Sequence, residues 1–147
     1  MDNCDFSSIQ NMQHTFHGHK GITSLDLSNW KNVNSVTNMA YFCSDTNISN
    51  LDISSFKLYN INNMNYIFDK VPNLTELKFG YDLNCEIGYS NIKYCTNLTQ
   101  ESVVSVLEGL NDRSNTTSLK AEIGSALIAK LTSDQIAIAT NKNWTVI

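Results

Sequence analysis

The sequence feature that most restricts the fold is an internal 26-residue repeat in the first half of the chain. Four hydrophobic columns recur in phase over three copies: Phe16, Phe42 and Phe68; Ile22, Ile48 and Leu74; Leu25, Leu51 and Leu77; and Leu27, Ile53 and Phe79. A second recurring string ends in Met12, Met39 and Met64, and its spacing predicts one inserted residue before Met39 and a compensating deletion after it. Self-similarity at such a period is typical of stacked repeat proteins, whose units bury their apolar faces against neighbouring units.

Each repeat unit contains a segment in which apolar and polar residues alternate, as in residues 25–27, 51–53 and 77–79. Alternation is the period of a half-buried strand. A single strand cannot bury its apolar side, so we expect the units to stack about 4.8 Å apart into a small parallel sheet. The Met and Phe columns then form the opposite wall of the core.

The 26-residue phase is lost after Gly80, and the remaining sequence predicts a cap that covers the end of the repeats. Thr99, with Glu101 in the first turn, predicts the start of a helix with an apolar face. Thr132 and Gln135 have the spacing of a capping box and predict a second helix.

Alternating residues predict a strand after each of these helices. We therefore expect an α/β protein with about three 26-residue repeats, a small parallel sheet and a C-terminal α/β cap. The expected boundaries are a single domain over 1–147, repeats over 5–80, and an irregular repeat plus a helix-strand-helix-strand cap over 81–147, with an irregular strand at 90–94 and cap strands at 118–123 and 144–147.

Composition excludes several functions. Only 16% of residues are charged and the net charge is −4, which argues against a nucleic-acid partner because phosphate binding needs a dense basic patch. No apolar run approaches the roughly 20 residues of a membrane span. Polarity comes from 20 Asn, 16 Ser and 12 Thr, and part of the Asn excess is explained by tight corners, which Asn tolerates.

The cysteines and the N-terminus leave alternatives open. The chain has four cysteines and no C-x-x-C motif, so the sequence does not predict a zinc ribbon or a redox motif. The cysteines are Cys4, Cys43, Cys85 and Cys95. They are interpreted as buried free thiols, with two disulfides as the alternative in a secreted chain. The first residues lack the basic and apolar regions of a signal peptide. Either the chain is not exported by its own signal, or it is an internal piece of a longer protein.

The repeat residues resemble the BspA-like leucine-rich repeats of bacterial surface proteins, which are also abundant in mycoplasma lipoproteins and gut-phage genomes. The matching strings are residues 25–30 (Leu-Asp-Leu-Ser-Asn-Trp), 36–39 (Val-Thr-Asn-Met) and 51–56 (Leu-Asp-Ile-Ser-Ser-Phe). Residues 131–135 and 141–145 are similar to the segment that often closes such arrays. The cysteine position of the family is occupied here by His19, Asp45 and Val71.

This resemblance implies a short leucine-rich-repeat solenoid and a role in surface display, adhesion or ligand binding, without catalysis. We expect the exposed face of the sheet to carry the binding surface, because that face of a solenoid is extended and rigid. Within it, Asp26, Asp52 and Lys78 share one column and indicate either a ligand or cation site or the turn chemistry of the repeat. The candidate binding residues are Thr23, Ser24, Asp26, Ser49, Asn50, Asp52, Thr75, Glu76 and Lys78.

Histidines and aromatic residues offer further candidates. His14, His17 and His19 cluster, but no Cys or carboxylate neighbours complete a metal site, so a solvated corner is favoured over a metal centre. Trp30 and Phe56 share a repeat column, which favours the core over a sugar-stacking platform. Exposed aromatic residues are instead expected at Tyr41, Tyr59 and Tyr66.

No catalytic motif or phosphate-binding loop is present in the sequence, so neither enzymatic activity nor a cofactor is expected. The first hypothesis is a non-enzymatic module at the cell surface or in the extracellular space that binds a protein or a surface glycan. The alternative is a structural subunit of a phage virion or another homo- or hetero-assembly. In that case residues 5–12, which resemble the second part of a repeat, would leave an open N-terminal coil that packs on other chains.

Overall fold

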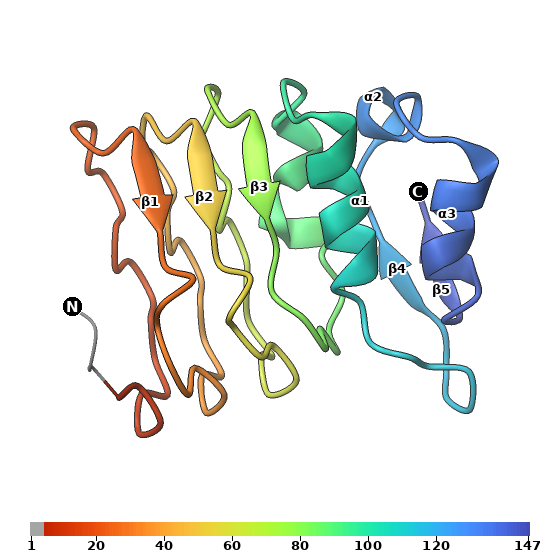
Figure 1. The fold of residues 1–147 in the computed structure, drawn as a ribbon, viewed down its shortest axis with the longest axis horizontal. Coiled ribbons are helices and arrows are strands. Elements are labelled where there is room, and N and C mark those ends of the chain that lie inside the picture. Colours follow the sequence, from red (N-terminus) through yellow and green to blue (C-terminus); the bar gives the residue numbers. More distant parts are fainter. Residues whose placement is uncertain (1–4) are drawn as a thin grey trace.

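A computed structural model describes residues 5–147, which fold as a small mixed α/β protein with two parallel sheets (Figure 1). The first sheet has the order β1-β2-β3, and the second pairs β4 with β5. The strands are β1 (Ser24–Asp26), β2 (Asn50–Asp52), β3 (Glu76–Lys78), β4 (Leu119–Ala121) and β5 (Trp144–Val146). The helices are α1 (Gln100–Glu108), α2 (Ser125–Ile128) and α3 (Ser133–Thr140), with 3-10 helices at Gly88–Ser90 and Ile92–Tyr94.

The first sheet keeps the register that the repeat predicts. Leu25 pairs with Leu51, and Leu51 pairs with Leu77, so each step along the sheet equals one repeat unit. On the other side of each unit, parallel bridges join Asn11 to Asn38 and Asn38 to Asn63. The first of these steps is one residue longer than the repeat, and the second is one residue shorter. These two steps confirm the insertion before Met39 and the compensating deletion after it.

The core lies between the strands and the chain segments that return from them. The leucine, isoleucine, methionine and phenylalanine columns meet there, as predicted. Its largest fully buried side chains are Phe42, Phe56, Phe68, Met39, Ile48, Leu51, Ile53, Leu58, Ile67, Leu74, Leu77 and Leu83. Burial is less complete in the first unit, where Ile22 and Leu25 are half-buried. Within residues 5–147, β1 has a neighbouring strand on one side only, which accounts for the difference.

Asparagine side chains close a repeated turn on the side opposite the strands. The Oδ1 atoms of Asn11, Asn38 and Asn63 each accept the backbone N–H two residues further along the chain, at 2.9, 3.0 and 3.2 Å. Asx turns of this kind satisfy backbone donors that no neighbouring unit reaches. The prediction that Asn serves the corners of the repeat is therefore confirmed.

Helix α1 covers the outer edge of β3 (Figure 1). The Oγ of Ser102 accepts the backbone N–H of Leu77 at 2.9 Å, and the Oγ of Ser105 accepts that of Phe79 at 2.8 Å. An unpaired edge N–H would be costly if buried without a partner. The two serines, three residues apart on one helix face, therefore replace the next strand of the sheet.

The two helices and the two closing strands predicted for the C-terminal part are present in the structure. Thr99 accepts the backbone N–H of Ser102 at the start of α1, and Thr132 and Gln135 form the predicted capping box of α3. Strands β4 and β5 lie within the two predicted segments. The irregular strand expected at 90–94 is wrong, because this segment forms parts of two 3-10 helices, and α2 was not predicted.

Substitution of Leu51, which is 2% exposed, tests the repeat register. We expect Leu51→Ala to lower the free energy of unfolding by about 2–5 kcal/mol. Leu51→Asp should abolish the cooperative unfolding transition, because it leaves an unpaired charge in the core. Urea denaturation followed by circular dichroism measures both. The neighbouring exposed change Asn50→Asp is the control, and a Leu51→Asp protein as stable as this control would contradict the register.

The variant Ser102→Ala tests whether the serine hydroxyls of α1 take the place of a fourth strand at the edge of β3. Loss of the buried Oγ leaves the N–H of Leu77 without its acceptor, so we expect a loss of about 1–3 kcal/mol in unfolding free energy. Ser105→Ala should cost less, because Ser105 is half-buried and water can replace its hydroxyl. The exposed Ser133→Ala serves as the reference and should change stability by less than about 0.5 kcal/mol. Equal losses in all three variants would show that the edge of β3 does not depend on these hydroxyls.

Candidate binding face

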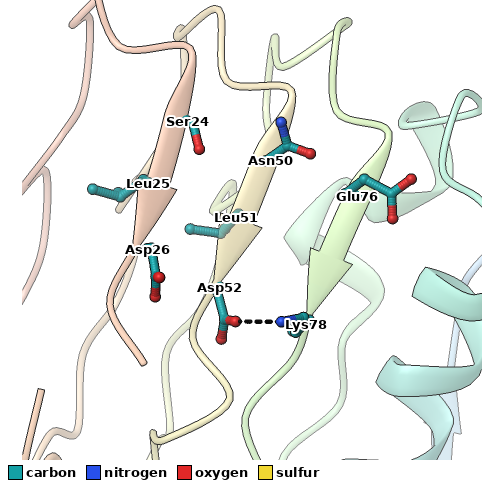
Figure 2. Close-up of a pocket in the computed structure, with 8 residues that line it drawn as sticks. All are labelled: Ser24, Leu25, Asp26, Asn50, Leu51, Asp52, Glu76 and Lys78. Atoms are coloured by element: carbon teal, nitrogen blue, oxygen red, sulfur yellow. Dashed lines mark ion pairs between the residues drawn. The ribbon is translucent and has the colours of Figure 1, made fainter. Parts of the chain in front are cut away.

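The solvent side of the first sheet carries a row of polar side chains two residues apart along each strand (Figure 2). Because alternate residues of a strand point to opposite faces, the central leucines face the core while their neighbours face outward. We call this surface the polar face, and its residues are Ser24, Asp26, Asn50, Asp52, Glu76 and Lys78. These six residues surround a shallow hollow of about 320 Å³, the strand hollow, whose lining Leu25 and Leu51 complete.

Six of the nine predicted binding residues therefore lie together, and the other three do not line the strand hollow. Thr23, Ser49 and Thr75 come directly before the strands and connect successive units. The Oγ of Ser49 donates to the carbonyl of Thr23 at 3.1 Å, and the Oγ1 of Thr75 donates to the carbonyl of Ser49 at the same distance. The hydroxyls of Ser49 and Thr75 thus join the backbone of one unit to that of the preceding unit.

The aspartates of the polar face each close a turn after their strand. The Oδ1 of Asp52 accepts the backbone N–H of Ser54 at 3.0 Å and its hydroxyl at 2.6 Å. Asp26 accepts the same two bonds from Ser28, at 2.9 and 2.6 Å. The bonds from Ser28 hold the pKa of Asp26 below its usual value. The turn interpretation of these aspartates is thus confirmed, and it leaves each carboxylate fixed in orientation at the rim of the hollow.

One ion pair crosses the polar face. The Nζ of Lys78 lies 3.0 Å from the Oδ2 of Asp52, as their shared column predicts (Figure 2). Burial acts to raise the pKa of Asp52, but the hydrogen bonds from Ser54 and Lys78 outweigh it and lower the pKa overall. Because Asp26 and Glu76 remain beside the pair, the face is acidic.

None of the cysteines among residues 5–147 lines the strand hollow. Within residues 5–147, Cys43, Cys85 and Cys95 are free thiols, and Cys4 lies outside the described residues. Burial raises the pKa of Cys85 to about 11 and that of Cys95 to about 12, and it raises the pKa of Cys43 further. Thiols with raised pKa values stay protonated and are poor nucleophiles.

The three histidines lie exposed at a corner of the first unit. The Nδ1 of His17 is 2.6 Å from the Oγ of Ser44, and the ring of His14 stacks on Tyr41 with centroids 4.7 Å apart. In the described part of the chain, no three side chains among His, Cys, Asp and Glu come together as metal ligands.

The aromatic candidates separate into core and surface. Phe56 is fully buried, and Trp30 is stacked between Phe6 and Phe56, which confirms the core interpretation of this column. Tyr59 and Tyr66 are exposed as predicted.

Tyr41 differs from the prediction of an exposed side chain. It is half-buried, because His14 covers one side of its ring and Tyr66 lies 4.9 Å away as a second stacking partner. Neither ring face is therefore free for a ligand.

The described residues thus form a small mixed α/β protein with two small parallel sheets and an open polar face. Residues 1–101 match the family described as Mycoplasma protein of unknown function, DUF285, and the chain belongs to this family. The match includes all three strands of the first sheet and the start of α1. No curated protein and no solved structure matches the sequence. Among the described helices, none has the length and apolar character needed to cross a membrane.

Acid titration tests whether the hydrogen bonds from Ser54 fix the carboxylate of Asp52 and lower its pKa. We expect Ser54→Ala to raise the pKa of Asp52, because the variant removes the hydroxyl donor. In the native protein the lowered pKa stabilises the fold above the pKa of the unfolded chain, about 3.9, and this contribution is lost as the pH falls through the lower folded value. The stability difference between native protein and variant should therefore be present at pH 7 and shrink in acid.

Carboxyl carbon NMR titration measures these pKa values directly. As a matched control, Ser28→Ala should raise the pKa of Asp26 and leave that of Asp52 unchanged. A Ser54→Ala protein in which Asp52 titrates as in the native chain would show that this turn does not fix the carboxylate.

Proposed function

We propose that the chain is a short leucine-rich-repeat solenoid of the BspA-like type and serves as a non-catalytic interaction module at the cell surface or in the extracellular space. Its polar face binds a protein or a glycan. Membership of a Mycoplasma family agrees with the occurrence of BspA-like repeats in mycoplasma lipoproteins. The constant register of the three strands and the closed edge of β3 support the solenoid assignment.

The observation that carries this proposal is the construction of the polar face. Parallel pairing in constant register places Ser24, Asn50 and Glu76 in one row and Asp26, Asp52 and Lys78 in the next. The result is a rigid surface of hydrogen-bonding groups around an open hollow, which suits a binding partner more than a reaction that needs exclusion of water. Serine hydroxyls and Lys78 already engage the carboxylates of Asp26 and Asp52, so these groups act as fixed acceptors.

A bulky side chain at the centre of the polar face tests this function. We expect the fluorescently labelled chain to bind cultured epithelial cells, and Asn50→Tyr to reduce the bound fluorescence by about tenfold or more, as for substitution of a central interface residue. Flow cytometry gives the measurement. The matched control is Asn62→Tyr, which places the same side chain at another exposed asparagine that does not line the strand hollow.

Light scattering after size-exclusion chromatography separates this function from the structural-subunit alternative. A monomer near 16.5 kDa that binds cells through the polar face supports the proposal. A defined assembly that does not bind cells overturns it, and so does equal loss of binding in the two tyrosine variants.

A further inference from the structure

A second hollow of about 320 Å³ lies at the end of β3 beside the last turn of α1. Its lining includes Ser54, Lys78, Tyr81 and Glu108 together with Gly80 and Gly109. We call it the Tyr81 hollow. The core covers only part of Tyr81, which is 48% exposed.

Close approach of two glycines shapes the Tyr81 hollow. A Cβ atom at Gly109 would lie 2.2 Å from the carbonyl oxygen of Gly80, and one at Gly80 would lie 2.5 Å from the carbonyl oxygen of Phe56. Side chains at these two positions are therefore excluded by backbone atoms. Their absence brings the end of α1 against the chain that leaves β3, with Tyr81 and Glu108 at the rim.

The two hollows share one lining residue, Lys78. Asp52, in the strand hollow, accepts the hydroxyl of Ser54, which lines the Tyr81 hollow, and it pairs with Lys78. The Asp52–Lys78 ion pair therefore connects the linings of the two hollows. The side chain of Lys78 is 74% exposed, so it can move without unfolding the core.

The groups that line the two hollows indicate the chemistry of an occupant. The linings of the two hollows contain four carboxylates, those of Asp26, Asp52, Glu76 and Glu108, and one cation, Lys78. Because Lys78 is already paired with Asp52, an anionic ligand is disfavoured. The carboxylates of Asp26 and Asp52 are oriented by serine hydroxyls, and oriented acceptors select donors of defined direction. Hydroxyl groups in fixed positions on a ring meet this requirement.

The tyrosine supplies the apolar part of the recognition. Tyr81 presents a rigid amphipathic ring, which can cover an apolar ring face and still hydrogen bond through its hydroxyl. Glu108, the last residue of α1, adds an exposed carboxylate to the lining of the Tyr81 hollow. The Nζ of Lys142 donates to the backbone carbonyl oxygens of Glu108 and Leu110 at 2.7 and 2.8 Å, and this cation offsets the unfavourable position of a carboxylate at the negative end of the helix dipole.

We propose that the strand hollow and the Tyr81 hollow form one groove that binds a neutral oligosaccharide. Tyr81 stacks on one sugar ring. The side chains of Asn50, Asp52 and Glu108 hydrogen bond to hydroxyl groups of the same oligosaccharide. This inference rests on the proposed function and names the ligand class of its polar face. A basic peptide is the competing occupant, since it would also meet the carboxylates.

A panel of immobilised glycans tests the proposal with the full chain. The probes are neutral linear oligosaccharides of glucose, galactose, mannose and N-acetylglucosamine, sialylated oligosaccharides, and an oligolysine peptide. We expect retention on at least one neutral probe, loss of affinity by about tenfold or more in Tyr81→Ala, and a change below about threefold in Tyr81→Phe, which keeps the ring. Tyr59→Ala removes a tyrosine of similar exposure, 53%, outside both hollows, and should bind as the native chain does.

The outcomes separate the two levels of inference. Absence of retention on every neutral probe, stronger binding to sialylated probes or oligolysine, or equal losses in Tyr81→Ala and Tyr59→Ala overturns the glycan proposal. If the chain still binds cells after their glycans have been removed enzymatically, and Asn50→Tyr abolishes that binding, the proposed function stands and the glycan inference fails. Loss of both kinds of binding in the native chain overturns both.

Discussion

Backbone hydrogen bonding between successive repeat units is the constraint on which the rest of this structure depends. Pairing of Leu25, Leu51 and Leu77 in one row fixes which side chains enter the core and which reach solvent. A slip of one residue in a strand would exchange its two faces and expose the leucine while burying polar neighbours. The apolar columns therefore also determine the polar face, because the residues that flank the leucines in each strand must point to the opposite, solvent side of the sheet.

The first sheet has three strands, and its outer edge at β3 is closed by helix side chains in place of a fourth strand. The two serines of α1 accept the N–H groups that a fourth strand would otherwise bind. The same helix also brings Gly109 onto Gly80 and places Glu108 beside Tyr81. One helix thus ends the repeats and builds the wall of the second hollow, so the cap and the candidate groove share their residues.

The sequence predicted the three strands of the first sheet, their order and all six polar-face residues, because the strand segments recur at the same spacing in three units. It did not predict the 3-10 helices around Tyr89 or the four-residue helix α2, since short elements outside the repeat have no periodic signal. The Tyr81 hollow was also missed. It depends on contact between Gly80 and Gly109, which lie far apart in sequence, and the phase of the repeat is lost at this point.

Asp52 shows why a structural and a functional reading of one residue need not exclude each other. Its Oδ1 closes the turn after β2 through Ser54, and its Oδ2 pairs with Lys78, which lines both hollows. In the proposed groove, a turn that the repeat uses for folding also fixes a carboxylate before a ligand binds. Such preorganisation lowers the entropy cost of binding. The neighbouring polar-face residues Asn50 and Glu76 are exposed and take no part in the core, so the turn and the core do not depend on their side chains.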